Sequence, residues 1–186
     1  MCYAFALSTL DVIFSFVLCC YRTRLSLHLL LPCSAQDTEP PHLSHLLTQS
    51  LLPALTLHLS QHPKSVTDIW LLVLQSESPS LESTLSAGLS VACAALADAG
   101  VALNGLGVGV AVAKTEEGIA VDPTGREARA AGARVTLGVL PALDTLTDVW
   151  MTGQASVADV LGMVDRAVAA SAGVHGRVAG VLAGAV

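Results

Sequence analysis

Residues 84–113 read TLSAGLSVACAALADAGVALNGLGVGVAVA. Large apolar side chains recur at helical spacing in the first half, which predicts a helix over residues 84–99 that packs closely through its many small residues. Its buried side is predicted to carry Leu85, Leu89, Cys93 and Leu96. Gly100 fits the left-handed position that follows a last helical turn. The apolar residues 106–113 predict a strand directly after it.

The flanking sequence predicts a mixture of helices and strands. A helix is expected over residues 43–59, with Pro53 kinking or restarting it. A second helix is expected to start at Ser156, its N-cap, and to end near residue 183. Strands are expected at 66–74, 118–121, 134–140 and 145–151, with a loop over 75–83. The order favours the α+β class or a split α/β fold, with a mixed sheet packed on helices.

Composition excludes several classes of protein. The 186 residues are 53% hydrophobic and only 13% charged, which is too apolar for a disordered chain. Nine Lys and Arg face fifteen Asp and Glu, a net charge of -6, so a general basic nucleic-acid binder is not expected. The five cysteines follow neither a zinc-ribbon spacing nor a disulfide framework.

The first 41 residues read differently from the rest, so we divide the chain into 1–41, an apolar leader and linker, and 42–186, a partial globular domain. Three interpretations of the leader stay open: a signal peptide or membrane anchor at residues 4–21, a buried N-terminal element, or the product of a wrong gene start. Asp11 and the lack of a preceding basic residue make the membrane unlikely as a partner.

Three segments, taken in order, resemble the RNase PH-like family. They are LLPALTLHLSQHPKSVTDIWLLVLQ (51–75), LSVACAALADAGVALNGLGVGVAVA (89–113) and VDPTGREARAAGARVTLGVLPALDTLTDVWMTG (121–153). The resemblance covers about residues 43–183 and is nearest to non-catalytic RNase PH-like ring subunits of the eukaryotic exosome, of the mRNA-transport-regulator type. It implies the second half of that fold, which is ribosomal protein S5 domain 2-like. The first half, with its basic RNA-contacting strands, is expected to be missing, which would leave a sheet edge uncovered.

The resemblance also implies partners and a site. The partners would be other RNase PH-like ring subunits, with RNA passing through the assembled channel and no small-molecule substrate, in the nucleus, nucleolus and cytoplasm. Phosphorolytic members hold phosphate with an arginine and hydroxyls where the alanine-rich helix opens. The matching positions are Thr84, Leu85 and Ser86, so the arginine is replaced by leucine. Of a second pair of acids, Asp122 is kept and Thr124 replaces the other.

These replacements predict a non-catalytic subunit without cofactor or metal that acts in 3′–5′ RNA processing and degradation. An active phosphate-dependent 3′–5′ exoribonuclease, and a membrane-anchored or non-functional fragment, remain alternatives. Asp122 is interpreted chiefly as a turn residue. The basic residues Lys64, Arg126, Arg129 and Arg134 are candidates for RNA or subunit contact, against a solvated face. The terminal helix either completes a tight core or adds a subunit interface, and in both cases much of it should be covered.

Overall fold

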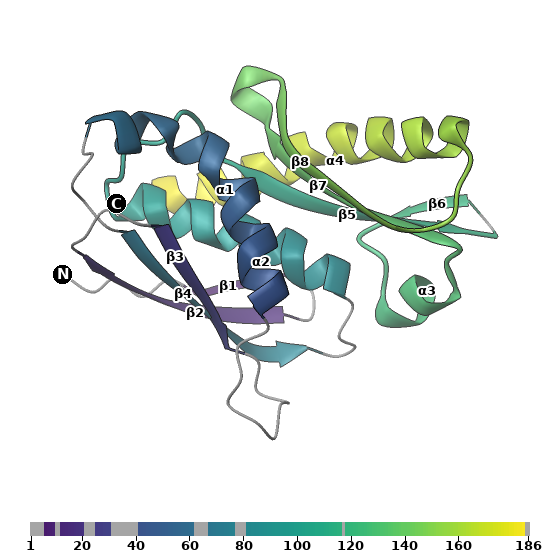
Figure 1. Ribbon diagram of the computed structural model, residues 1–186, viewed down its shortest axis with the longest axis horizontal. Helices are drawn as coiled ribbons and strands as arrows, with labels where there is room; N and C mark the ends of the chain where they lie inside the picture. The colour runs from purple at the N-terminus through teal and green to yellow at the C-terminus, as the bar shows by residue number, and fades with distance from the viewer. Residues whose placement is uncertain are drawn as a thin grey trace.

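The computed structural model describes residues 6–9, 12–20, 25–30, 41–61, 67–76, 81–116 and 118–184. Strands and helices alternate along the chain without a repeat (Figure 1). Their bounds are β1 Ala6–Thr9, β2 Val12–Cys20, β3 Leu25–Leu30, α1 Pro41–Gln61, β4 Thr67–Ser76, α2 Leu81–Asp98, β5 Val108–Thr115, β6 Gly118–Val121, α3 Gly125–Ala130, β7 Ala133–Leu140, the 3₁₀ turn η1 Pro141–Leu143, β8 Thr145–Gly153 and α4 Val157–Gly184. The α+β class and the packing of mixed strands on helices are confirmed.

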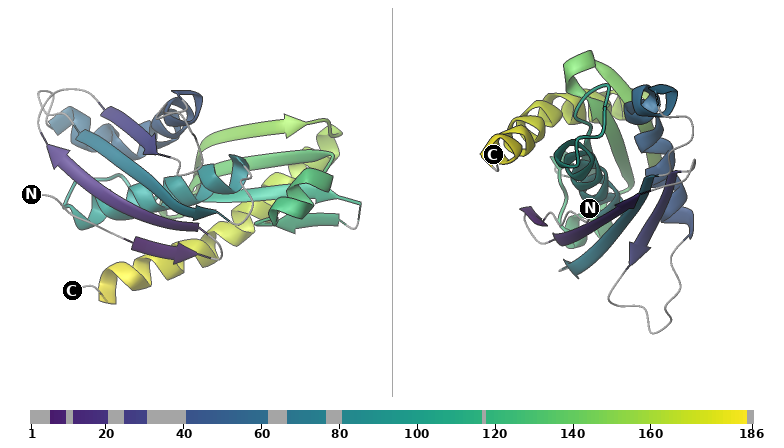
Figure 2. Two further views of the ribbon diagram at one scale, coloured as in Figure 1. Left: turned by 90° about the horizontal axis from the view of Figure 1, so that it is seen from below. Right: turned by 90° about the vertical axis from the view of Figure 1, so that its left-hand side faces the viewer.

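Two four-stranded sheets enclose the helices α1 and α2. The first has the strand order β1-β2-β4-β3 and the second β6-β5-β7-β8. Helix α2 contacts both sheets, and α4 covers the opposite face of the second sheet (Figures 1 and 2). Because side chains alternate along a strand, Gly109 on β5 faces α2, whereas its neighbours Val108 and Val110 pack with Met163 of α4.

Strand β4 has a neighbour on each side. It pairs with β2 in antiparallel and with β3 in parallel orientation, so β4 is an inner strand, and β1 and β3 form the edges of the described part of the first sheet. The apolar second half of β4 would suit burial on both faces, but Trp70 does not follow this pattern. Ile69 and Leu71 are fully buried, but Trp70 is 39% exposed, because the helices cover one face of this sheet only.

Pro53 bends helix α1 without ending it, and the loop after α2 contacts the helix at this point. Helix α1 continues through Pro53 and bends along its length (Figure 1). Asn104, in the loop after α2, donates its side-chain amide to the Pro53 carbonyl and its backbone N–H to the Ala54 carbonyl, both at 2.9 Å. These bonds supply donors to carbonyl groups at the bend.

Helix α2 begins at Leu81 rather than at residue 84, so the end of the predicted loop is helical. Glu82 lies in the first turn, where the helix dipole favours a carboxylate. The helix is buried almost throughout, and its small residues allow the close approach that the sequence predicts. A Cβ at Gly107 would lie 2.8 Å from the Cys93 sulfur, so only glycine fits there without a shift. The Cys93 thiol is fully buried, and this burial raises its pKa to about 12.

Helix α4 departs from the expectation that much of it would be covered. One face packs on the second sheet and buries four side chains, Met163, Ala167, Ser171 and Val178. On the other face Val157 is 78% and Leu161 60% exposed. Within the described residues no further layer lies over this face, so the core interpretation holds for one side of the helix only.

The short helix α3 was not expected. Thr124 is its N-cap: the Glu127 backbone N–H donates to the Thr124 hydroxyl at 3.4 Å, and the Glu127 carboxylate accepts from the Thr124 backbone N–H at 2.8 Å. This is a capping box, which the spacing Thr-x-x-Glu in the sequence already encodes. Thr124 therefore serves local structure at the position where the resemblance places a second acid.

Replacing Thr124 with alanine should lower the free energy of unfolding by about 1 kcal/mol. The bonds from Thr124 hold the pKa of Glu127 below its ordinary value, so its contribution is present above that value and is lost as the pH falls through the lowered pKa. Urea unfolding of wild type and Glu127→Gln from pH 7 to pH 3 checks this. The two curves should converge at low pH; a gap that widens on acidification would contradict it.

Candidate functional site

The three positions matched to a phosphate site lie inside the protein. Thr84, Leu85 and Ser86 are in the first turns of α2, and each is at most 6% exposed. The Ser86 hydroxyl donates to the Ser83 carbonyl at 3.0 Å. Position 85 is part of the hydrophobic core between α1, α2 and β4.

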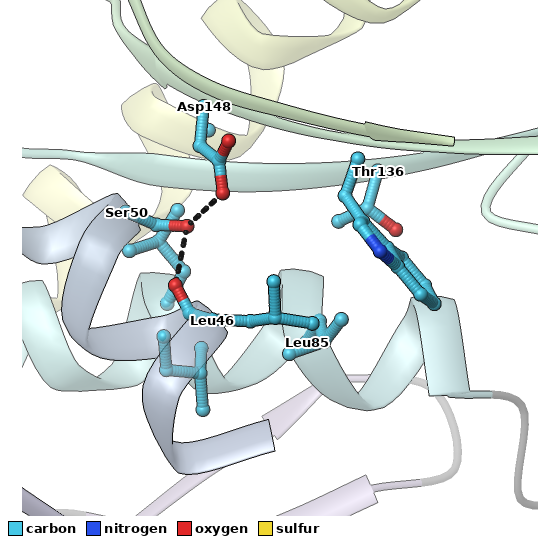
Figure 3. A pocket seen from close by; sticks show the side chains of 9 residues that line it. Leu46, Ser50, Leu85, Thr136 and Asp148 are labelled. Atoms are coloured by element: carbon cyan, nitrogen blue, oxygen red, sulfur yellow. Dashed lines mark hydrogen bonds between the residues drawn. The ribbon is translucent and has the colours of Figure 1, made fainter. Parts of the chain in front are cut away.

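Leu85 lines a small pocket between α1, α2 and the second sheet (Figure 3). The other lining residues are Leu46, Leu47, Ser50, Leu89, Thr136, Gly138, Asp148 and Trp150. The enclosed space is about 10 Å³, which is barely the room for one water molecule. The pocket is therefore too small for inorganic phosphate.

The hydroxyl and carboxylate groups of this pocket are acceptors or are already engaged. The Ser50 hydroxyl donates to the Asp148 carboxylate at 2.8 Å, and the same oxygen lies 3.0 Å from the Leu46 carbonyl (Figure 3). The backbone N–H of Val149 donates to the other Asp148 oxygen at 2.8 Å. Asp148 is the one charged residue of the lining, and its charge repels an anion.

Helix α2 meets β5 through a contact that only glycine permits. The Gly109 backbone N–H donates to the Ser90 hydroxyl at 2.9 Å, and that hydroxyl lies 3.0 Å from the Ser86 carbonyl. A Cβ at Gly109 would lie 2.5 Å from the Ser86 Cα, well inside the contact distance. The absence of a side chain at Gly109 therefore lets α2 approach β5 closely.

An ion pair between buried Glu82 and partly exposed Arg134 lies at the start of α2, and sequence reasoning missed it. Glu82 is 2% exposed; its Oε1 accepts from the Thr152 hydroxyl at 2.8 Å and lies 3.2 Å from Arg134 Nε. Arg134 is thus a structural cation whose charge is balanced inside the fold. Only the position of Glu82 near a helix start hinted at this, because its partners lie on distant strands.

The remaining candidates lie elsewhere. Asp122 is at the end of β6 with a positive φ of 53°, and neither it nor Thr124 lines the pocket. Arg126 and Arg129 are exposed on α3, where Arg129 Nε donates to the Gly125 carbonyl at 3.0 Å. Lys64 lies outside the described residues. Of the three basic candidates among the described residues, Arg134 pairs with Glu82, whereas Arg126 and Arg129 lie exposed on α3.

The described residues offer neither a metal site nor a membrane-spanning helix. They contain no group of three or more His, Cys, Asp and Glu side chains able to hold a metal ion. The His42 ring instead packs edge-on to Trp150, with 6.4 Å between ring centroids. None of the described helices combines the length and hydropathy needed to cross a membrane.

The fold and the sequence together define the family. Residues 5–102 match the 3′ exoribonuclease family, domain 1, so the chain belongs to that family. The matched range includes most of the stretch 1–41 that the sequence analysis set apart; the boundary at residue 41 stays a prediction. The structure of rice (Oryza sativa) Rrp46 shares the fold with a TM-score of 0.81 and 20% identity, covering 98% of this chain and 93% of that one. The RNase PH-like fold is confirmed.

Two curated proteins illustrate the relationship. The chain is 33% identical to the exosome complex component Rrp41 of Pyrobaculum aerophilum over 60% of this chain and 43% of that protein. It is also 33% identical to the exosome complex component mtr3 of Schizosaccharomyces pombe over 65% of this chain and 47% of that protein. The chain thus spans somewhat less than half the length of these two relatives.

Proposed function

We propose that the chain is a non-catalytic subunit of an exosome ring of RNase PH-like subunits, which guides RNA to 3′–5′ processing and degradation performed by another nuclease. Relatives that are exosome components support the assembly, and such a role places the chain in the nucleus, nucleolus and cytoplasm. The observation that carries the non-catalytic part is the burial of Leu85 in an apolar core at the position where phosphorolytic members carry arginine.

Phosphorolysis demands a positive charge that this site does not offer. A phosphate dianion has to approach a polyanionic RNA end, which requires fixed cations and donors at the attacking oxygen. Around Leu85 the lining carries one charge, that of Asp148, and it is negative. The Arg134 guanidinium is held by buried Glu82. The described residues around Leu85 therefore lack the positive charge needed to hold the attacking group.

Exposed apolar side chains on the second sheet suit a neighbouring subunit. Strand β8 pairs only with β7 among the described strands, so its outer edge is open. Leu143, Leu146 and Val149, which we call the β8 margin, are 46–50% exposed. We assign the β8 margin to contact with a ring neighbour. The exposed Arg126 and Arg129, together with Lys64, remain candidates for contact with RNA or with the other neighbour.

Changing Leu146 to lysine should remove the chain from the ring without unfolding it. A charge in an apolar interface is desolvated on assembly, whereas an exposed substitution in the free chain costs within about 0.5 kcal/mol. Co-purification of tagged full-length chain with co-expressed RNase PH-like subunits measures incorporation, and thermal unfolding measures stability. Gln154→Lys, at an exposed site just after β8, adds the same charge and should assemble normally. Unchanged incorporation of Leu146→Lys would contradict the assignment.

A further inference from the structure

The carboxylate of Glu82 lies in a site built from donors. Thr152 on β8 and Arg134 on β7 are directly paired residues of adjacent strands, so the hydroxyl and the guanidinium lie side by side facing α2. Both contact the same oxygen, Oε1, at 2.8 Å and 3.2 Å. A guanidinium next to a hydroxyl is a donor set that proteins use to bind oxyanions.

The start of α2 adds a third favourable feature. Glu82 is the second residue of the helix, where the helix dipole favours a negative charge. The carboxylate therefore contacts a cation and a hydroxyl and belongs to the first turn of a helix. The combination matches the way in which helix starts bind free anions.

The carboxylate fills this site only in part. Its second oxygen, Oε2, is buried and has no hydrogen-bond partner among the described residues. A buried charged oxygen without a donor lowers stability, so maximal stabilisation of Glu82 does not explain the arrangement. The donors Arg134 and Thr152 suit an oxyanion. The Glu82 carboxylate serves as that oxyanion, but only one of its two oxygens meets a donor.

We propose that Glu82 is an internal oxyanion that occupies a small-oxyanion site between the start of α2 and strands β7 and β8, and so excludes external anions such as phosphate or formate. The inference rests on the proposed non-catalytic function and gives a reason for it: the site is taken by a side chain that cannot leave. Removal of the carboxylate should open the site to a free oxyanion.

The test is thermal unfolding of full-length Glu82→Ala in formate, phosphate or chloride at equal ionic strength. We expect formate or phosphate to raise the Tm of the variant by about 3–5 °C at ten times the dissociation constant, while chloride does not. Wild type, and Glu116→Ala at an exposed site, should show no such preference. The double variant Glu82→Ala/Arg134→Gln should lose the response, because Arg134 supplies the charge.

If Glu82→Ala does not fold in chloride, the yield of folded protein after refolding in formate replaces the Tm as the readout. A Tm or yield that is the same in all three salts would overturn the proposal, and so would an equal response in wild type. The proposed function fails by a different result, the release of nucleoside diphosphates by wild-type protein, so the two failures are distinguishable.

Discussion

Gly109→Ala is expected to lower the free energy of unfolding by about 3 kcal/mol, at the upper end of what overpacking costs. The added methyl group would lie 2.5 Å from the Ser86 Cα and within 3 Å of its carbonyl carbon. Both are backbone atoms of α2, so rotation of a side chain cannot relieve the overlap. The helix has to move away from β5, which also stretches the 2.9 Å bond from the Gly109 N–H to Ser90.

Urea unfolding of the full-length chain measures this effect. The matched control is Gly173→Ala in α4, where a Cβ meets nothing within 4 Å. There alanine should raise stability by up to about 1 kcal/mol, because glycine is the poorer helix former. A Gly109→Ala variant within 0.5 kcal/mol of wild type would show that α2 and β5 are not in this close contact.

Leu85→Arg introduces the residue type that the proposed resemblance to phosphorolytic enzymes implies at this position, and it is expected to destabilise the chain by about 3 kcal/mol or more, because it buries a charge in an apolar site. The guanidinium would face Leu46, Leu47 and Leu89 in a space that barely holds one water molecule. Asp148 is the one opposite charge in the lining, and it already accepts bonds from Ser50 and Val149.

The control is Leu85→Met, which nearly conserves volume and should cost less than about 1.5 kcal/mol. The readouts are urea unfolding and phosphate titration by calorimetry. We expect Leu85→Arg to be unstable and to bind no phosphate. A variant as stable as wild type that takes up phosphate would mean that position 85 still lies at an accessible anion site.

Much of the fold follows from local sequence patterns. The alternation of apolar residues and the turn residues around them predict β5, β6, β7, β8 and α4 to within a few residues. The small residues of α2 and the single glycine of β5, Gly109, favour their close contact, because small side chains permit such an approach. The spacing Thr-x-x-Glu also indicates the capping box of Thr124 and Glu127, although we did not predict helix α3 from it.

The rest depends on contacts between distant residues. The exposure of Trp70 depends on which face of β4 the helices cover, and apolar composition alone does not indicate this. Glu82 and Thr152 are 70 residues apart in sequence, so their hydrogen bond exists only once α2 has docked on the second sheet. The burial of Leu85 was therefore predictable from its place on the apolar side of the helix, whereas the ion pair between Glu82 and Arg134 was not.

Incubation of RNA with inorganic phosphate and the purified full-length chain, alone and within the co-purified ring, tests the central claim most directly. Nucleoside diphosphates are measured against time, with a catalytic phosphorolytic RNase PH-family enzyme as positive control. We expect no release of nucleoside diphosphates above the level without protein, because no described cation is free to hold phosphate beside Leu85. Phosphate-dependent release of nucleoside diphosphates by the chain alone would contradict it.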